Sequence, residues 1–93
     1  GQGTATYANG DAYVGGFVAD QREGRGTFTG ADGFRYEGEW KAGQMEGQGT
    51  ATYPDGSVYV GGFTAGLADG QGKITYADGS TYEGQWKGGV IEG

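Results

Sequence analysis

The side chains that could carry out chemistry in this sequence are carboxylates, tyrosines and two serines, because the chain contains no histidine and no cysteine. Ser57 and Ser80 lie next to expected turns, with no histidine or thiol to complete a nucleophilic site. Glu37 and Glu39 would share one face of a strand, as the side chains of any solvated face do. These residues therefore predict a chain that is not an enzyme.

Seven of the other ten acidic residues follow the pattern of turns and loops. Asp32, Asp55 and Asp78 each precede a glycine, and a further set precedes a glycine at the 23-residue period, in three cases the first of a Gly-x-Gly: Glu23, Glu46, Asp69 and Glu92. Neither set has the spacing of a calcium-binding loop. Each Gly-x-Gly is expected to precede a strand rather than a helix, so it does not form a phosphate-binding loop. We expect no metal site and no cofactor.

Charge and composition restrict the classes of partner. The 93 residues include six basic and twelve acidic ones, for a net charge of -6, and no segment concentrates lysine or arginine. Nucleic acid is excluded as a partner, because clustered cations supply most of that affinity. Anionic phospholipid is disfavoured for the same reason, although it remains an alternative, and we expect the dispersed basic residues, Arg22 among them, to be solvated surface groups rather than a lipid site. The chain begins at Gly1, so we expect a fragment of a longer chain, and its compartment is not predicted.

A fixed period of 23 residues runs through the whole sequence. One block recurs at Tyr13, Tyr36, Tyr59 and Tyr82 with the pattern Tyr-x-Gly-x-Trp/Phe, and a second begins at Gly1, Gly24, Gly47 and Gly70 with Gly-x-Gly. Self-similarity at a period of this length indicates a stacked array of structural repeats.

The dipeptides between the two blocks predict how the array is built. Asn9-Gly10, Asp32-Gly33, Asp55-Gly56 and Asp78-Gly79 favour tight type I′ hairpin turns, so the flanking strands pair antiparallel. We expect loops of about six residues, such as 41 to 46, between the hairpins. The predicted strands cover about residues 1 to 7, 11 to 17, 24 to 30, 34 to 40, 47 to 53, 57 to 63, 70 to 76 and 80 to 86.

Strand alternation predicts that all thirteen aromatic side chains share one face. Gly38 lies on this face between Tyr36 and Trp40, and we expect it to leave space for a ring from a neighbouring strand. One repeat departs from the pattern, since Gly30 stands where the others carry tyrosine. Phe28 and Phe34 add ring volume on either side, as a packed face requires.

This combination of period, glycines, aromatics and turns resembles the MORN (membrane occupation and recognition nexus) repeat. The resemblance covers residues 1–93 as about four repeats. It implies an all-β fold: an elongated, twisted, single-layer antiparallel meander of about eight strands, with a groove lined by the repeat aromatics. The chain also resembles, more loosely, the choline-binding or glucan-binding repeats. Those repeats typically carry adjacent aromatic pairs, which this sequence lacks.

The resemblance implies a non-catalytic scaffold that docks a protein partner or associates with itself. Alternatives are peripheral binding to anionic membrane and a regulatory module of an enzyme encoded outside this segment. The aromatic face is either the core of the sheet or a binding groove. For the groove, we predict these partner-binding residues: Tyr13, Phe17, Tyr36, Trp40, Tyr59, Phe63, Tyr82 and Trp86. Open sheet edges offer a second route to self-association.

Overall fold

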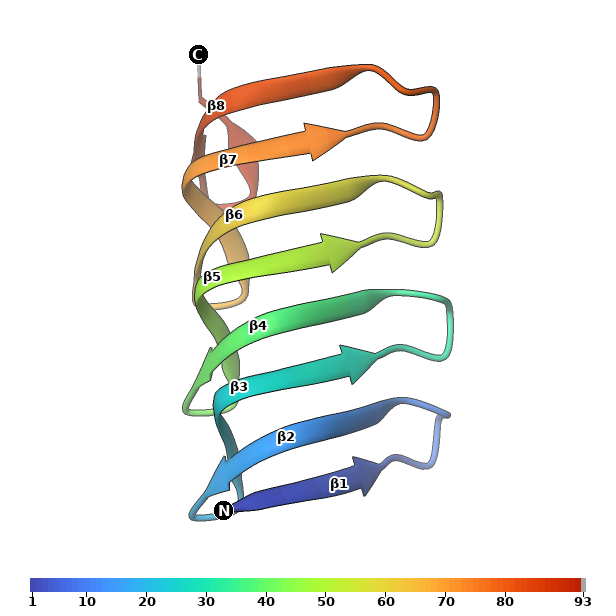
Figure 1. The fold of residues 1–93 in the computed structure, drawn as a ribbon, viewed down its shortest axis with the longest axis vertical. Helices are drawn as coiled ribbons and strands as arrows, with labels where there is room; N and C mark the ends of the chain where they lie inside the picture. Colours follow the sequence, from blue (N-terminus) through green and yellow to red (C-terminus); the bar gives the residue numbers. More distant parts are fainter. Residues whose placement is uncertain (93) are drawn as a thin grey trace.

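The computed structural model describes residues 1–92, which form nine antiparallel strands in one sheet whose order in space follows the sequence. The molecule is elongated, with extents of 38 × 23 × 16 Å (Figure 1). Its strands are β1 Gln2–Thr6, β2 Ala12–Val18, β3 Gln21–Thr29, β4 Arg35–Lys41, β5 Gln44–Thr52, β6 Val58–Thr64, β7 Leu67–Thr75, β8 Thr81–Lys87 and β9 Val90–Ile91. The all-β meander predicted from the sequence is confirmed, with one strand more than expected.

The expected turn types were wrong: the Asn-Gly and Asp-Gly segments, expected to form type I′ turns, form three-residue loops, and the type I′ turns lie where loose loops were expected. Pro54 and Asp55 keep negative φ, and only Gly56 is positive at 95°. The Gly56 N–H donates to the Tyr53 carbonyl at 2.9 Å, and the Tyr53 N–H donates to the Ser57 carbonyl at 2.8 Å. This is a three-residue loop built on a type I turn, with a glycine in the left-handed region. The same hydrogen bonds recur at the other Asn-Gly and Asp-Gly turns.

Aspartates stabilise these loops through side-chain hydrogen bonds. The Asp55 Oδ1 accepts the Ser57 N–H at 2.9 Å, and the Asp78 Oδ1 accepts both the N–H and the hydroxyl of Ser80. Hydrogen bonds from these serines lower the pKa of each aspartate carboxyl below its ordinary value. The aspartates are therefore explained by turn structure.

The tight two-residue turns lie at the other ends of the strands, where we expected loose loops. Their central residues both have positive φ, as in Ala42 at 50° with Gly43 at 83°, and Ala65 at 51° with Gly66 at 84°. Such a pair defines a type I′ turn, so β3, β5 and β7 extend into the segments expected to be loops. The same arrangement after β8 produces the ninth strand.

Each long strand bends where the Gly-x-Gly begins. Gly47 has φ of 73°, and the pairing of β4 with β5 shifts register between Gly38 and Trp40. Equivalent shifts separate Gly15 from Phe17 and Gly61 from Phe63. In Figure 1 the ribbons curve at the left-hand edge, and the two-residue turns lie behind the sheet. The bend folds the single layer partly over its own aromatic face.

Glycine provides the space for tyrosine on that face, although a different glycine from the one we expected. Tyr36 lies opposite Ala51, and a Cβ added at Gly49 would overlap the Tyr36 ring and hydroxyl. A Cβ added at Gly38 would instead meet the Gly49 Cα, at 2.5 Å. Gly38 therefore allows close backbone approach, while Gly49, on the neighbouring strand, receives the ring.

Gly49→Ala tests this packing. The new methyl would push the fully buried Tyr36 ring off its neighbour, so we expect a loss of about 1 to 3 kcal/mol in unfolding free energy. Chemical denaturation measures the loss. Gln48→Ala, at the exposed preceding residue, is the matched control and should change stability by less than about 0.5 kcal/mol. Equal effects of the two substitutions would contradict the assignment.

Ala65→Asn tests the turn assignment. Asparagine adopts positive φ with less strain than alanine and is favoured at the first central position of a type I′ turn, so we expect a gain of about 0.5 kcal/mol. Thermal unfolding should shift upward by about 3 °C. Ala77→Asn, at a negative-φ position in a three-residue loop, is the control. A lower melting temperature for Ala65→Asn would contradict the type I′ assignment.

Candidate functional site

The eight residues predicted for the groove form one continuous stack of rings, here called the aromatic column. Adjacent rings meet edge to face, with centroids 5.0 to 5.8 Å apart. Such T-shaped pairs are the favoured arrangement of aromatic side chains. In spatial order the column runs Phe17, Tyr13, Trp40, Tyr36, Phe63, Tyr59, Trp86 and Tyr82.

Hydrogen bonds fix the column to the backbone. The Tyr36 hydroxyl donates to the Glu39 carbonyl at 2.8 Å, and the Tyr13 and Tyr59 hydroxyls donate to the Gly16 and Gly62 carbonyls at 3.0 Å. The indole N–H of Trp40 donates to the Gly26 carbonyl at 3.0 Å. Trp86 repeats this bond with Gly72 at 3.1 Å. The polar ends of these five rings are therefore satisfied within the fold, which favours a structural role for them.

Most of the column is core rather than surface. Tyr13, Tyr36 and Tyr59 are 0%, 0% and 1% exposed, and Phe63 and both tryptophans are also buried. Phe17 and Tyr82 are half-buried at the two ends. The structure thus brings the eight predicted residues together, and it leaves their role in partner binding a prediction.

The surface above the column is a hollow along the inside of the bend, here called the inner groove. This groove consists of three adjoining hollows. The first, beside Tyr7, shares Arg22 and Phe28 with the second, and the second shares Phe34, Met45 and Gly66 with the third, which contains Ala68. Its main side chains are Tyr7, Arg22, Phe28, Phe34, Trp40, Met45, Tyr53, Tyr59, Phe63, Leu67, Ala68, Ile74 and Trp86. Four members of the column therefore reach the groove: Trp40, Tyr59, Phe63 and Trp86.

The other groove residues were missed as binding residues, although the sequence carried a signal for two of them. The ring centroids of Phe28 and Phe34 lie 6.3 Å apart, and those of Phe34 and Tyr53 lie 5.6 Å apart. These two phenylalanine rings therefore replace the ring that is absent at Gly30. Met45, Leu67 and Ile74 gave no signal, because they lie in segments assigned to loops or outside the aromatic pattern.

Arg22 is the one basic residue of residues 1–92 that lines the inner groove, which corrects our expectation of a dispersed, solvated cation. Its guanidinium carbon lies 4.7 Å from the Trp40 ring centroid, 5.5 Å from that of Phe28 and 5.8 Å from that of Tyr13. One guanidinium nitrogen donates to the Gly43 carbonyl at 3.0 Å. Cation–π attraction and this hydrogen bond hold Arg22 over the rings.

Acidic side chains support the groove wall formed by the two-residue turns. The Glu23 carboxylate accepts the Ala42 N–H at 3.0 Å, and the Glu46 carboxylate accepts the Ala65 N–H at 2.9 Å. Successive turns are also linked through the backbone, as in the bond from the Gly66 N–H to the Met45 carbonyl at 3.0 Å. Glu23 and Glu46 are thus tied to loop structure, as their positions suggested.

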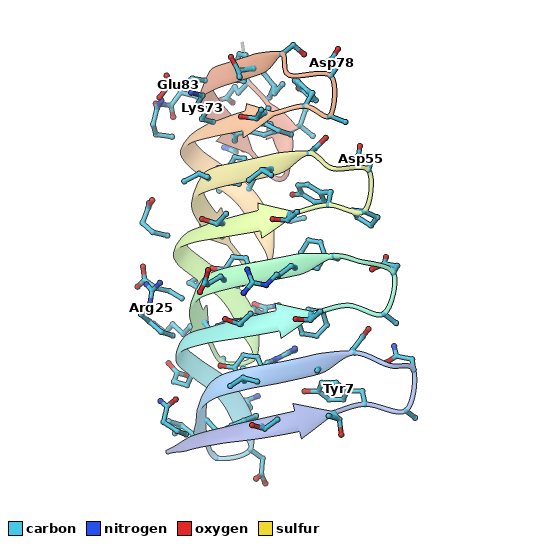
Figure 2. All side chains as sticks on the ribbon, turned by 45° about the vertical axis from the view of Figure 1, so that its right-hand side comes forward. Tyr7, Arg25, Asp55, Lys73, Asp78 and Glu83 are labelled. Carbon is cyan, nitrogen blue, oxygen red and sulfur yellow. The ribbon has the colours of Figure 1, made fainter. Side chains whose placement is uncertain are left out.

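On the outer face, three of the remaining basic residues lie next to acidic ones. Arg35 lies 3.8 Å from Glu37, while Arg25 and Lys73 stand opposite Glu39 and Glu83 on adjacent strands. In Figure 2, Arg25, Lys73 and Glu83 project from the outer side of the bend. This mixed surface offers no cationic patch for an anionic membrane.

The described part of the chain contains no group of three or more acidic, histidine or cysteine side chains placed to hold a metal ion. No helix of sufficient length and hydrophobicity to cross a bilayer occurs within residues 1–92.

Comparison with known families agrees with this architecture. The MORN repeat family model matches residues 1–12, 13–35, 36–58, 59–81 and 82–93, so three complete and two partial repeats span the chain. The chain belongs to the MORN repeat family. A comparison with curated proteins finds no significant match. Family membership indicates a repeat-based module for interaction with proteins or membranes, of a kind that is generally non-catalytic.

Alkaline titration tests the burial of the column. Burial raises the pKa of Tyr36 to about 12 from its ordinary value of 10.0, and it also raises the pKa of Tyr13 and Tyr59. A pKa raised in the folded state gives stability that is complete below pH 10 and is lost as pH rises through about 12. We expect cooperative unfolding in this window, together with tyrosinate formation, by circular dichroism and absorbance.

Tyr36→Phe provides the comparison for this titration. It keeps the ring but cannot ionise, so its stability should fall less steeply above pH 10, despite about 1 kcal/mol lost with the hydrogen bond at neutral pH. Identical pH dependence in the two proteins would contradict a buried, protonated Tyr36.

Proposed function

We propose that this chain is a non-catalytic scaffold module that docks a protein partner along the inner groove. The observation that carries the proposal is the groove itself, three adjoining shallow hollows that cross the repeats above the buried aromatic column. Their walls are mainly aromatic and aliphatic with a few polar groups, which is typical of peptide-binding surfaces.

The column and the groove residues have different roles in this proposal. Trp40, Phe63 and Trp86 line the groove and keep a small exposed area that would contact a partner, whereas Tyr13, Tyr36 and Tyr59 are fully buried and hold the shape. Phe17 and Tyr82, half-buried at the two ends of the column, would contact a partner there. Alanine at Trp40 or Tyr59 would create a large cavity costing about 3 to 5 kcal/mol, so these substitutions cannot separate binding from folding.

Leu67 allows a cleaner test, because its side chain lines the groove and is 51% exposed. Val60, which is 53% exposed and does not line the groove, is its matched control. The probe is a phage-displayed library of random peptides, followed by affinity measurement on the selected sequences. We expect the chain to select peptides. Leu67→Glu should weaken their binding roughly tenfold or more, and Val60→Glu should leave their affinity unchanged.

Three outcomes would overturn the proposal. These are failure to select any peptide, equal weakening by Leu67→Glu and Val60→Glu, and salt-sensitive co-sedimentation with phosphatidylserine vesicles in place of peptide selection. The last would make an anionic membrane the partner. Concentration-dependent self-association that Leu67→Glu abolishes would instead identify the partner as a second copy of the chain.

A further inference from the structure

One position of the repeat varies in size and charge along the groove. Arg22, Met45, Ala68 and Ile91 are spaced by the 23-residue period and lie opposite Phe17, Trp40, Phe63 and Trp86. Met45 and Ile91 are large apolar side chains, whereas Arg22 introduces a positive charge and Ala68 removes volume. The inner groove is therefore chemically different at these two places.

Arg22 has hydrogen-bonding capacity that the fold does not use. Its side chain is half-buried, it makes one side-chain hydrogen bond, to Gly43, and it forms no ion pair within residues 1–92. A guanidinium carries five N–H donors, so several remain for a partner. Arg22 lines both the first and the second hollow of the groove, where an incoming acceptor can reach it.

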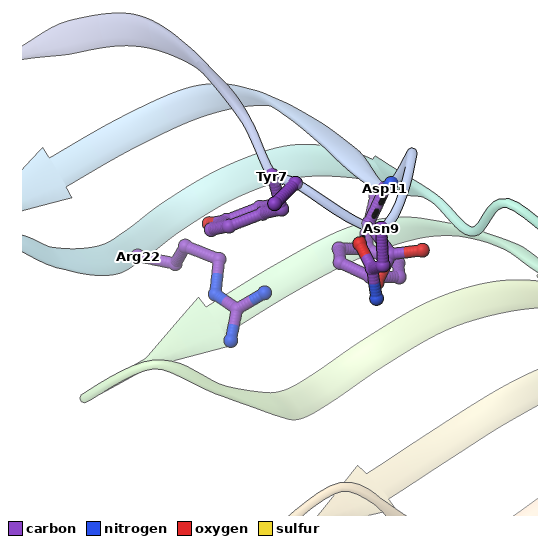
Figure 3. A pocket seen from close by; sticks show the side chains of 6 residues that line it. Tyr7, Asn9, Asp11 and Arg22 are labelled. Atoms are coloured by element: carbon purple, nitrogen blue, oxygen red, sulfur yellow. Dashed lines mark hydrogen bonds between the residues drawn. The ribbon is translucent and has the colours of Figure 1, made fainter.

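The acidic residue that lines the first hollow, Asp11, forms no ion pair with Arg22. Asp11 accepts the Ala31 N–H at 2.8 Å through Oδ1 and the Asn9 side-chain amide at 3.1 Å through Oδ2. Figure 3 shows the Arg22 guanidinium and the Tyr7 ring on one side of the pocket, with Asn9 and Asp11 on the other. A carboxylate from a partner would thus meet a cation whose charge is not paired.

The region around Ala68 has the opposite character. Ala68 is 7% exposed at the base of a hollow with apolar walls, formed mainly by Phe34, Met45, Tyr53, Tyr59, Phe63, Leu67, Ile74 and Trp86. The small methyl leaves room where Met45 and Ile91 place longer side chains in their own repeats. A bulky apolar side chain from a partner would bury its surface here without displacing a charge.

We propose that the inner groove takes a peptide segment carrying an acidic side chain for Arg22 and a bulky apolar side chain for the hollow above Ala68. This inference rests on the proposed function. Arg22 and Ala68 are two repeats, or four strands, apart, so the two anchors are about 19 Å apart at about 4.8 Å per strand. That distance matches about 13 residues of helix or about six residues of extended chain.

A protein segment fits this pair of anchors better than a lipid headgroup. One basic residue near a membrane contributes only about 1 kcal/mol, and this chain has a net charge of -6. The apolar hollow would gain nothing from a headgroup. A peptide satisfies both anchors at once.

The test applies peptide selection to variants that borrow residues from the neighbouring repeat. Arg22→Met and Ala68→Met both install the residue found at position 45, so both are expected to fold, which thermal unfolding checks. Arg25→Met, on the outer face of the same strand, removes the same charge elsewhere. Each selected peptide is also synthesised with its acidic residues replaced by amides.

We expect the unmodified chain to select peptides with an acidic and a bulky apolar residue at one recurring spacing. Arg22→Met should weaken binding of the acidic peptides roughly tenfold or more. It should leave the affinity for the amide versions unchanged, since those peptides cannot form the charge-assisted hydrogen bond with Arg22. Ala68→Met should remove the preference for a bulky apolar residue while keeping the acidic one. Arg25→Met should change neither preference.

Two results would overturn the inference while leaving the groove intact. One is selection of peptides that depend on Leu67 but show no acidic preference. The other is equal weakening of acidic and amide peptides by Arg22→Met, which indicates a structural role for Arg22. Absence of any selected peptide would overturn the proposed function as well.

Discussion

A single-layer sheet has no second layer to cover its apolar face, and here the packing of tyrosine onto glycine takes that role. Each buried tyrosine lies across a glycine on the next strand, so Tyr13, Tyr36 and Tyr59 rest on Gly26, Gly49 and Gly72. Any side chain at these glycines would overlap the ring. The pairing therefore fixes the register of neighbouring strands and, with it, the 23-residue period.

The bend follows from the same contact and divides the molecule into support and surface. A tyrosine hydroxyl donates to a carbonyl at the bend, as Tyr36 does to Glu39, and the T-shaped rings then stack across repeats. Because this column carries the packing, residues that lie above it are freer to differ between repeats. The series Arg22, Met45, Ala68 and Ile91 occupies such positions, so groove chemistry can vary without altering the sheet.

The sequence predicted the features that depend on periodicity and missed those that depend on backbone conformation. The β4 segment alternates between exposed and buried residues from Arg35 to Lys41, as predicted from its glycines and aromatics. Asp-Gly was interpreted as a type I′ pair, but the loop includes the preceding residue, so Pro54 and Asp55 keep negative φ. Ala42-Gly43 forms the real type I′ turn, although alanine is an uncommon residue there.

The site shows a similar division, because residue type alone does not reveal where a charge lies. Arg22 was taken for a solvated cation, and only the bend places it over Trp40. The net charge of -6 disfavours approach of an acidic partner at long range, whereas Arg22 attracts its carboxylate on contact. Salt screens charges beyond about 8 Å but weakens a half-buried contact less. Recognition in this groove would therefore depend on short-range fit rather than on electrostatic steering, which favours selectivity over rapid association.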